Sequence, residues 1–163
     1  MVSPADILNA DILIVDDLDA NVLVLARMLA SAGYTSVSST MEPREVCGLH
    51  RRNRYDLILL DLQMPGMDGF QVMDGLKEIE PDGYLPVLVI TAQPGHKLRA
   101  LKGGAKDFIG KPFELAEVQA RVRNMLEVRL LQKNCTITTT CWSNGCGNGP
   151  PISRKAIWKP FSR

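Results

Sequence analysis

Five polar residues of this 163-residue chain, in four places, are of the types that handle metal ions and phosphate. They are Asp16-Asp17, Asp61, Thr91 and Lys111. Carboxylates held close together repel one another, and a divalent cation relieves that repulsion. Oxygen ligands without His or Cys select Mg²⁺ or Mn²⁺, and bound Mg²⁺ often takes a phosphate oxygen as a further ligand. A lysine and a hydroxyl can bind the same phosphoryl group, so the set predicts an aspartyl phosphate if its members meet.

Each of these groups follows a segment that is expected to be a strand. The segments are Ile12–Val15, Leu57–Leu60, Pro86–Ile90 and the shorter Asp107–Ile109. The first three are continuous apolar runs, which are typical of strands buried on both faces of a parallel sheet. The carboxyl ends of parallel strands share one edge of the sheet, where ligands bind in open α/β folds. We therefore expect the four groups to lie together.

Helical segments separate the strands. The expected helices lie between Asp19 as N-cap and Gly33 as C-cap, and at 42–52, 69–79, 97–102 and 114–132, with a weak edge strand at Thr35–Ser39. Asp68 is expected to cap the helix at 69–79. The last helix should bury a stripe of apolar residues, namely Leu115, Val118, Val122 and Met125. Strand and helix alternate five times, which predicts a parallel α/β sheet with right-handed crossovers.

The composition bounds the domain organisation. A hydrophobic content of 45% is enough for one core extending to about Lys133. Residues 1–133 hold 15 basic and 18 acidic residues, and this mildly acidic balance argues against a nucleic-acid surface. No apolar run reaches transmembrane length, and residues 1–10 lack the features of a signal peptide. We expect a soluble cytoplasmic protein with an N-terminal extension (1–10), one folded domain (11–133) and an irregular tail (134–163).

The chain resembles the receiver domain of two-component response regulators. The resemblance rests on Asp16-Asp17, Asp61, Thr91-Ala92, Lys111-Pro112 and the intervening run Met64-Pro65-Gly66-Met67-Asp68-Gly69, all in the family's order and spacing. It extends from about Ala10 to Lys133. The fold that it implies is the flavodoxin-like doubly wound (βα)5 unit, whose five parallel strands have the order 2-1-3-4-5.

The resemblance also implies a metal site. Asp61 would be the phosphoacceptor, and it would bind Mg²⁺ (or Mn²⁺) directly together with Asp17. The backbone carbonyl of Gln63 would be a further ligand, and Asp16 would act mainly through a bound water.

A second set of residues would bind the phosphoryl group and change conformation when it is present. Thr91 and Lys111 would contact it, and the peptide bond between Lys111 and Pro112 is expected to be cis, which aims Lys111 inward. Phe108 matches an aromatic switch position of the family. Because phenylalanine has no hydroxyl, such a switch would work through ring burial alone, and a plain core residue is the alternative.

The implied partner is a sensor histidine kinase or a phosphotransfer protein, whose phosphohistidine donates the phosphoryl group. Phosphorylation would shift a pre-existing equilibrium in the segments 97–102, 107–109 and 114–132. The face with Leu98, Lys102 and Lys106 would be the output surface and a candidate homodimer interface. On this interpretation the chain is a phosphoacceptor that assists its own phosphorylation and dephosphorylation, and it is not a turnover enzyme.

Two alternatives use similar parts. A phosphohydrolase of the haloacid-dehalogenase kind also has an Asp nucleophile and Mg²⁺, but its nucleophile lies in Asp-x-Asp after the first strand. Here Asp16 and Asp17 are adjacent, and Asp61 follows the third strand. A flavin-binding module needs a phosphate loop of Ser, Thr or Gly after the first strand, where Asp17 and Asp19 would repel phosphate.

The tail differs from the rest of the chain. It is rich in Thr, Gly and Pro, a composition that cannot bury a core. Its cysteines, Cys135, Cys141 and Cys146, do not have zinc-site spacing. We also consider a frameshift: with one base lost after the Lys133 codon, the neighbouring frame can encode a helix with heptad-like spacing. That helix resembles the linker of response regulators with an HD-GYP-type cyclic-dinucleotide phosphodiesterase, and sequencing the coding DNA decides the matter.

Overall fold

A computed structural model describes residues 2–81 and 84–143, with side chains as far as residue 134. The chain divides into two units, Met1–Gln132 and Lys133–Arg163, and the sheet and its core belong to the first. None of the helices in the described ranges combines the length and the apolar character needed to cross a membrane.

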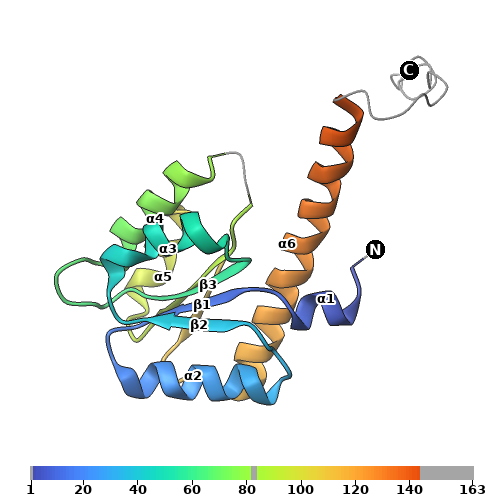
Figure 1. Cartoon of the computed structure of the whole chain (residues 1–163). Coiled ribbons are helices and arrows are strands. Elements are labelled where there is room, and N and C mark those ends of the chain that lie inside the picture. The colour runs from blue at the N-terminus through green and yellow to red at the C-terminus, as the bar shows by residue number, and fades with distance from the viewer. Residues whose placement is uncertain (1, 82–83, 144–163) are drawn as a thin grey trace, which may run out of the picture. The chain divides into compact units, whose positions relative to one another are not determined.

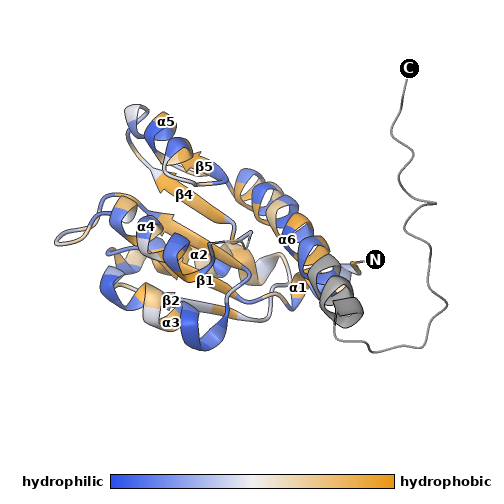
Figure 2. Cartoon of the chain, turned by 90° about the horizontal axis from the view of Figure 1, so that it is seen from above, coloured by the Kyte–Doolittle hydropathy of each residue, from blue (hydrophilic) through white to orange (hydrophobic). Residues whose placement is uncertain are grey.

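The centre of the first unit is a five-stranded parallel sheet (Figure 1). Its strands are β1 (Ile12–Val15), β2 (Val37–Thr40), β3 (Leu57–Asp61), β4 (Val87–Thr91) and β5 (Asp107–Gly110). They lie in the order β2-β1-β3-β4-β5, so the predicted flavodoxin-like sheet is confirmed. All residues of β1, β3 and β4 are buried, as the continuous apolar runs predict, and β1 and β4 are mostly orange (hydrophobic) in Figure 2. The edge strand β2 is partly exposed.

Helices cover both faces of the sheet. The described helices are α1 (Pro4–Leu8), α2 (Asp19–Ser31), the 3-10 turn η1 (Pro43–Glu45), α3 (Val46–Asn53), α4 (Gly69–Ile79), α5 (Gly95–Lys102) and α6 (Leu115–Ser143). One core lies between the sheet and α1, α2 and the first half of α6. The other lies between the sheet and α3, α4 and α5. Alternate residues of each strand enter the two cores, because side chains point to opposite faces of a sheet.

The helix caps agree with the sequence in one case and differ in another. Asp68 caps α4 as expected: its carboxylate accepts a hydrogen bond from Gln71 N–H at 3.0 Å, and Gln71 Oε1 accepts from Asp68 N–H. The expected Asp19 cap is wrong, because Leu18 is the N-cap of α2 and Asp19 is the first helical residue. There its charge still complements the positive end of the helix dipole. At the other end Ala32 is the C-cap, and Gly33 follows it with φ +97°.

Both ends of the folded unit differ from expectation. Residues 1–10 were expected to be an extension, but Pro4–Leu8 is a helix with a Ser3–Asp6 capping box, and Ile7 is buried in the core. One turn of helix is too short to show a periodic pattern. Leu115, expected inside, is 44% exposed, whereas Val118, Val122 and Met125 are buried as predicted.

Helix α6 is longer than the sequence pattern indicates. It was expected to end at 132, and the tail was expected to be irregular from 134, but the helix continues to Ser143. Extending an existing helix adds one hydrogen bond per residue without a new nucleation step, so weak helix formers can be included. Cys135 and Cys141 therefore lie within the helix. Residues 144–163, with Cys146, lie outside the described residues, and the frameshift hypothesis stays a prediction.

Candidate functional site

The predicted polar groups meet at the carboxyl edge of the sheet. Asp16 directly follows β1 and Asp61 ends β3, and these strands are paired so that Val15 lies opposite Leu60. Thr91 ends β4 and is paired with Gly110, the residue before Lys111. The strand register therefore brings residues that are 95 positions apart, Asp16 and Lys111, into contact. We call Asp16, Asp17, Asp61, Thr91 and Lys111 the acid edge.

Three carboxylates of the acid edge can bind one ion together. Asp16, Asp17 and Asp61 each offer an oxygen, and these oxygens all lie within 4.8 Å of one another. Asp16 and Asp61 are buried, with exposed fractions of 0% and 2%, while Asp17 is partly exposed. Three oxygens converging from two adjacent strand ends, with one side open to solvent, form a donor set that suits a hard divalent cation.

Lys111 supplies the positive charge of this edge. Its Nζ donates to Asp61 Oδ2 at 3.0 Å and to Asp16 Oδ2 at 3.4 Å. The peptide bond between Lys111 and Pro112 is cis, as the resemblance implied. One ammonium group against three carboxylates leaves the acid edge with an excess of negative charge.

The pKa of Asp61 is raised, mainly by burial. Burial raises the pKa of Asp61 above its ordinary value of 3.8, and the Asp16 charge adds to the rise. Hydrogen bonds from Lys111 and from Gln63 N–H act in the opposite direction without cancelling it. The folded protein thus holds the Asp61 carboxylate in an environment that disfavours its negative charge, and a bound cation would relieve this.

Asn21 was missed by the sequence reasoning. Its Nδ2 donates to both oxygens of Asp16, at 3.0 and 3.2 Å, and Leu18 N–H donates to Asp16 Oδ1 at 2.9 Å. Asn21 lies in the first turn of α2, just after the loop that begins at Asp16. A polar side chain in the first turn of the helix that follows Asp16 was the sequence signal that could have identified Asn21. Its role is to orient the Asp16 carboxylate.

Two further predicted residues are near Asp61. Thr91 lies at the end of the neighbouring strand β4, and Gln63 follows Asp61 by two residues. The Thr91 hydroxyl is buried, donates to the Gln93 carbonyl at 3.4 Å and accepts from Gln93 N–H at 3.1 Å. Gln63 N–H donates to Asp61 Oδ1 at 3.2 Å, and its side chain is exposed. The ligand role of the Gln63 carbonyl stays a prediction.

Gly69 sets how closely α4 approaches Asp61. A Cβ atom at Gly69 would lie 2.7 Å from the Asp61 carbonyl oxygen and 2.9 Å from Leu62 Cα, both of which are backbone atoms. Any side chain there would push the start of α4 away from the end of β3. The close packing around Asp61 therefore needs glycine at 69.

Phe108, the expected switch residue, is neither fully buried nor free in solvent. Lys97 Nζ lies 4.8 Å from the centroid of its ring, and the Arg121 guanidinium carbon lies 5.9 Å from it. The ring therefore lies near cationic side chains of both α5 and α6, and it also packs against the core between the sheet and α3, α4 and α5. The switch role of Phe108 stays a prediction.

Sequence comparisons match this geometry. Residues 12–123 match the family described as the response regulator receiver domain. The chain is 40% identical over 126 residues to response regulator PleD of Caulobacter vibrioides, covering 76% of this chain and 28% of PleD. It is 36% identical over 121 residues to the transcriptional regulatory protein YvrH of Bacillus subtilis, covering 73% of this chain and 50% of YvrH. The chain thus spans between about a quarter and a half of the length of these curated relatives.

Solved structures agree. The receiver domain of the sensor histidine kinase PA1611 from Pseudomonas aeruginosa superposes with a TM-score of 0.67 at 30% identity, covering 73% of this chain and 98% of that one. Its crystal structure has a magnesium ion coordinated in the active-site cleft. NtrX from Brucella abortus superposes with a TM-score of 0.71 at 26% identity, covering 80% of this chain and 29% of NtrX. By sequence and by fold, this chain belongs to the response regulator receiver domains of two-component signalling.

Proposed function

We propose that Asp61 accepts a phosphoryl group from the phosphohistidine of a sensor histidine kinase or a phosphotransfer protein, in a reaction that depends on Mg²⁺ or Mn²⁺. The observation that carries the proposal is the convergence of three carboxylates within 4.8 Å, with Lys111 Nζ 3.0 Å from Asp61. Such a set binds a cation and a phosphoryl group better than it binds anything uncharged.

The donor set fits the metal. Asp17 and Asp61 would bind it directly, the Gln63 carbonyl would complete the protein ligands, and Asp16 would act from the second layer, held by Asn21. All of these ligands are oxygens, as Mg²⁺ requires. The metal would neutralise charge on the transferring phosphoryl group.

The protein's own residues would orient the transfer. Asp61 is the nucleophile: the P–N bond of the phosphohistidine breaks, its electron pair stays on the imidazole nitrogen, and a P–O bond forms to the carboxylate. Hydrogen bonds from Lys111 and Gln63 N–H hold the two Asp61 oxygens in place beforehand. Lys111 then pairs with the new phosphoryl oxygens, and the Thr91 hydroxyl turns from Gln93 to donate to one of them.

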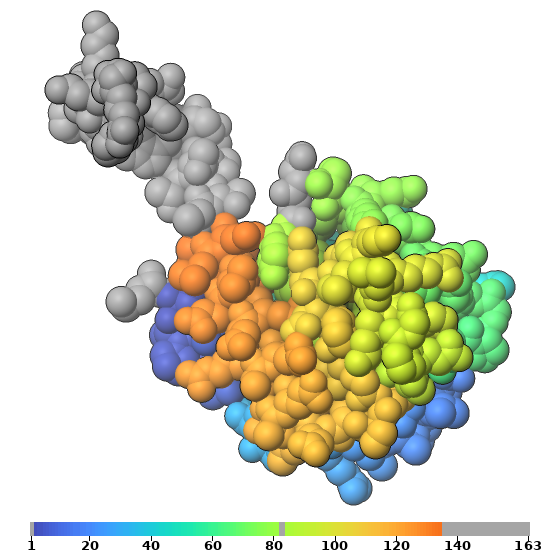
Figure 3. Space-filling view, turned by 180° about the vertical axis from the view of Figure 1, so that it is seen from behind, coloured from blue at the N-terminus to red at the C-terminus, as the bar shows by residue number. Residues whose placement is uncertain are grey.

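The output surface would be the face formed by α5, β5 and α6. Figure 3 shows the yellow to orange residues of α5 and α6 forming one continuous surface. Leu98 is 63% exposed there, and Lys102 and Lys106 are exposed as well. A movement of Thr91 would reach this face through Phe108, whose ring lies against Lys97 and Arg121. A homodimer through the same surface is part of the proposal.

Acetyl phosphate tests the proposal without a kinase. With Mg²⁺, intact-mass spectrometry should show the gain of one phosphoryl group, which hydroxylamine releases and which EDTA prevents from forming. Asp61→Asn should abolish the gain. Asp74→Asn, the same change at an exposed position of α4, should not alter it.

The phosphohydrolase alternative receives no support from the comparisons, which match regulators. The same experiment separates the two functions. A receiver retains its label and releases phosphate slowly, whereas a hydrolase would consume acetyl phosphate in many turnovers. Sustained turnover, or phosphorylation that survives in Asp61→Asn, would contradict our proposal.

A further inference from the structure

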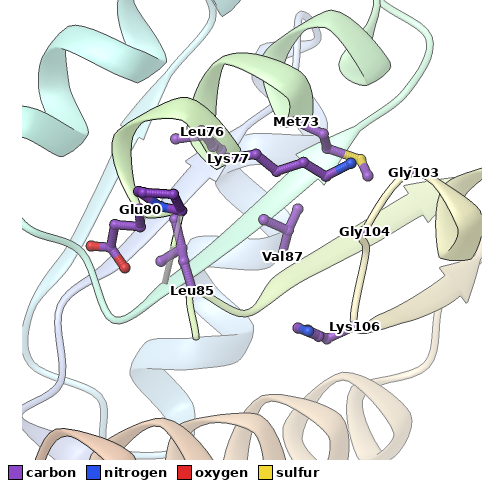
Figure 4. A pocket seen from close by; sticks show the side chains of 10 residues that line it. Met73, Leu76, Lys77, Glu80, Leu85, Val87, Gly103, Gly104 and Lys106 are labelled. Atoms are coloured by element: carbon purple, nitrogen blue, oxygen red, sulfur yellow. The ribbon is translucent and has the colours of Figure 1, made fainter. Parts of the chain in front are cut away.

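A cavity of about 440 Å³ lies at the amino ends of the strands, away from the acid edge (Figure 4). Val87, the first residue of β4, lines it, whereas Thr91 at the acid edge is the last residue of that strand. Val87 and Thr91 are four positions apart along the strand, a distance of about 13 Å. We infer that this cavity is a second binding site, for a small molecule with an apolar body and one anionic group. This inference is independent of the phosphorylation proposed above.

The floor of the cavity is apolar. Met73 and Leu76 come from α4, and Leu85 and Val87 come from the start of β4. All four are at most 9% exposed as whole residues, so the surface that they present is hollowed rather than protruding. Figure 4 shows Val87 between α4 and the turn at Gly103 and Gly104, and Leu85 below the end of α4 near Glu80. A volume of this size lies in the range of small-molecule pockets, which are mostly lined by apolar side chains.

The charges around this floor are cationic. Lys77 reaches across from α4, and Lys106 approaches from the start of β5 (Figure 4). Lys77 Nζ lies 3.7 Å from Asp74 Oδ1, but both side chains are at least half exposed, so this pair neutralises little of its charge. Lys106 Nζ lies 4.8 Å from the centroid of the Tyr84 ring, which leaves its charge in place.

Glu80 is the acidic residue of the cavity lining, and its charge is already neutralised. Its Oε1 lies 2.9 Å from His50 Nε2, and its Oε2 lies 3.2 Å from Arg129 Nη2. Figure 4 shows the carboxylate turned away from Val87 and Lys106. An occupant would therefore meet two lysines and no free carboxylate, and this favours an anion.

Two glycines, which have no side chains, form the wall of the cavity opposite α4. A Cβ atom at Gly104, whose φ is +104°, would lie 2.5 Å from Lys77 Cε. A Cβ atom at Gly103 would lie 3.2 Å from Met73 Cε, the flexible end of a side chain, and 3.3 Å from the carbonyl oxygens of Arg99 and Ala100. A side chain at 103 would thus be directed at the cavity floor. The backbone there has φ −70°, which any residue can adopt, so position 103 is suited to a variant that fills the cavity.

A fluorescent probe tests the inference. The full chain is titrated with 1-anilinonaphthalene-8-sulfonate, which carries aromatic rings and one sulfonate, and with N-phenyl-1-naphthylamine, which has the rings alone. We expect saturable binding of the sulfonate and about tenfold weaker binding in the double variant Lys77→Gln/Lys106→Gln. Binding of the neutral analogue should be the same in both proteins. Lys102→Gln, an exposed lysine of α5 that does not line the cavity, is the matched control.

A second experiment tests whether the sulfonate binds in this cavity. Amide shifts in ¹H–¹⁵N spectra on adding the sulfonate should concentrate at residues 73–77 and 103–106, and Gly103→Leu should abolish binding. If Gly103→Leu does not fold, as judged by circular dichroism, the lysine variants and the amide shifts still decide. Equal affinity in the double variant, an equal loss in Lys102→Gln, or shifts confined to other residues would overturn the inference.

Discussion

The two ends of the sheet carry charged clusters of opposite design. At the carboxyl end the acid edge has three carboxylates and one lysine, and it is short of positive charge. At the amino end, Glu80 and Asp56 lie beside Arg129 and the neutral His50. We call these four residues the Arg129 cluster. Arg129 donates to the Tyr84 carbonyl and to Glu80, so its charge is matched within the protein.

The two clusters have different roles: the acid edge is a candidate ligand site, whereas the Arg129 cluster supports the fold. In the Arg129 cluster the arginine lies between two carboxylates, so its positive charge is paired inside the protein, although His50 Nδ1 and Arg129 Nε are buried without a hydrogen-bond partner among the described residues. A buried cluster of this kind holds the elements that it joins in place, here α3, β3, α4 and α6. A cluster with surplus charge of one sign costs stability until a ligand of the other sign arrives. Both clusters hold more carboxylates than cations, so the arrangement of the carboxylates separates them: at the acid edge three carboxylate oxygens lie within 4.8 Å of one another, as a shared cation requires.

Removing Arg129 should have the largest effect on stability. Arg129→Met leaves the Glu80 carboxylate with only the exposed Arg54, at 3.7 Å, as a cationic neighbour among the described residues, and loss of one partner of a buried pair costs about 3–5 kcal/mol. Urea denaturation measures the change. Arg123→Met, an exposed arginine of the same helix, should change the free energy of unfolding by less than about 0.5 kcal/mol. Equal effects of the two variants would mean that the Arg129 cluster is not a support.

Mg²⁺ should act on the acid edge alone. At a concentration of 100 times its dissociation constant, a ligand that binds only the folded protein stabilises it by about 2.7 kcal/mol. This increase should be seen in thermal melts of the wild type and should be lost in Asp17→Asn. It should persist in Arg129→Met, measured against that variant's own lower baseline. An Mg²⁺ effect that survives in Asp17→Asn would place the ion elsewhere.

Two glycine-to-alanine substitutions should change the free energy of unfolding in opposite directions. Gly69→Ala introduces a Cβ atom 2.7 Å from the Asp61 carbonyl oxygen, and such overpacking costs about 1–3 kcal/mol. It should also slow phosphorylation by acetyl phosphate, because it moves the backbone at Asp61. Gly48→Ala lies in α3 with no atom within 4 Å of its Cβ, and alanine should stabilise that helix by up to about 1 kcal/mol. Denaturation of the two variants in parallel checks the contrast.

The smallest effect is an opposite dependence on pH at the two ends. Burial lowers the pKa of His50 below 6.5 despite its bond to Glu80, so the stability due to neutral His50 is lost as pH falls below 6.5. Burial raises the pKa of Asp61 above 3.8, so its contribution is favourable below 3.8 and is lost as pH rises through the raised value. Each slope is at most about 1.4 kcal/mol per pH unit.

Denaturation at several pH values in EDTA separates these contributions. His50→Gln should flatten the loss of stability between pH 7 and pH 5.5. Asp61→Asn should gain stability relative to the wild type as pH rises from 4 to 7. If both variants keep the wild-type profile, neither group controls the pH dependence of folding.

The sequence alone determined most of the acid edge. Apolar runs ending at Asp16, Asp61 and Thr91 indicated buried parallel strands, and parallel strands that share a sheet also share the edge at which they end. Chain topology therefore brought these residues together without any knowledge of side-chain packing. The strand order came from the family resemblance, and Asp68 was identified as the cap of α4 from its position before an apolar helical pattern.

Only the tertiary structure decided the remaining contacts. Arg129 and Glu80 are 49 positions apart and meet through the packing of α6 beside the end of α4, which no local pattern encodes. Asn21 binds Asp16, Gly69 lies against Asp61, and α1 buries Ile7 for the same reason. Periodicity shows which face of an element is buried, whereas contacts between side chains depend on distances of a few ångströms that arise only when the elements pack.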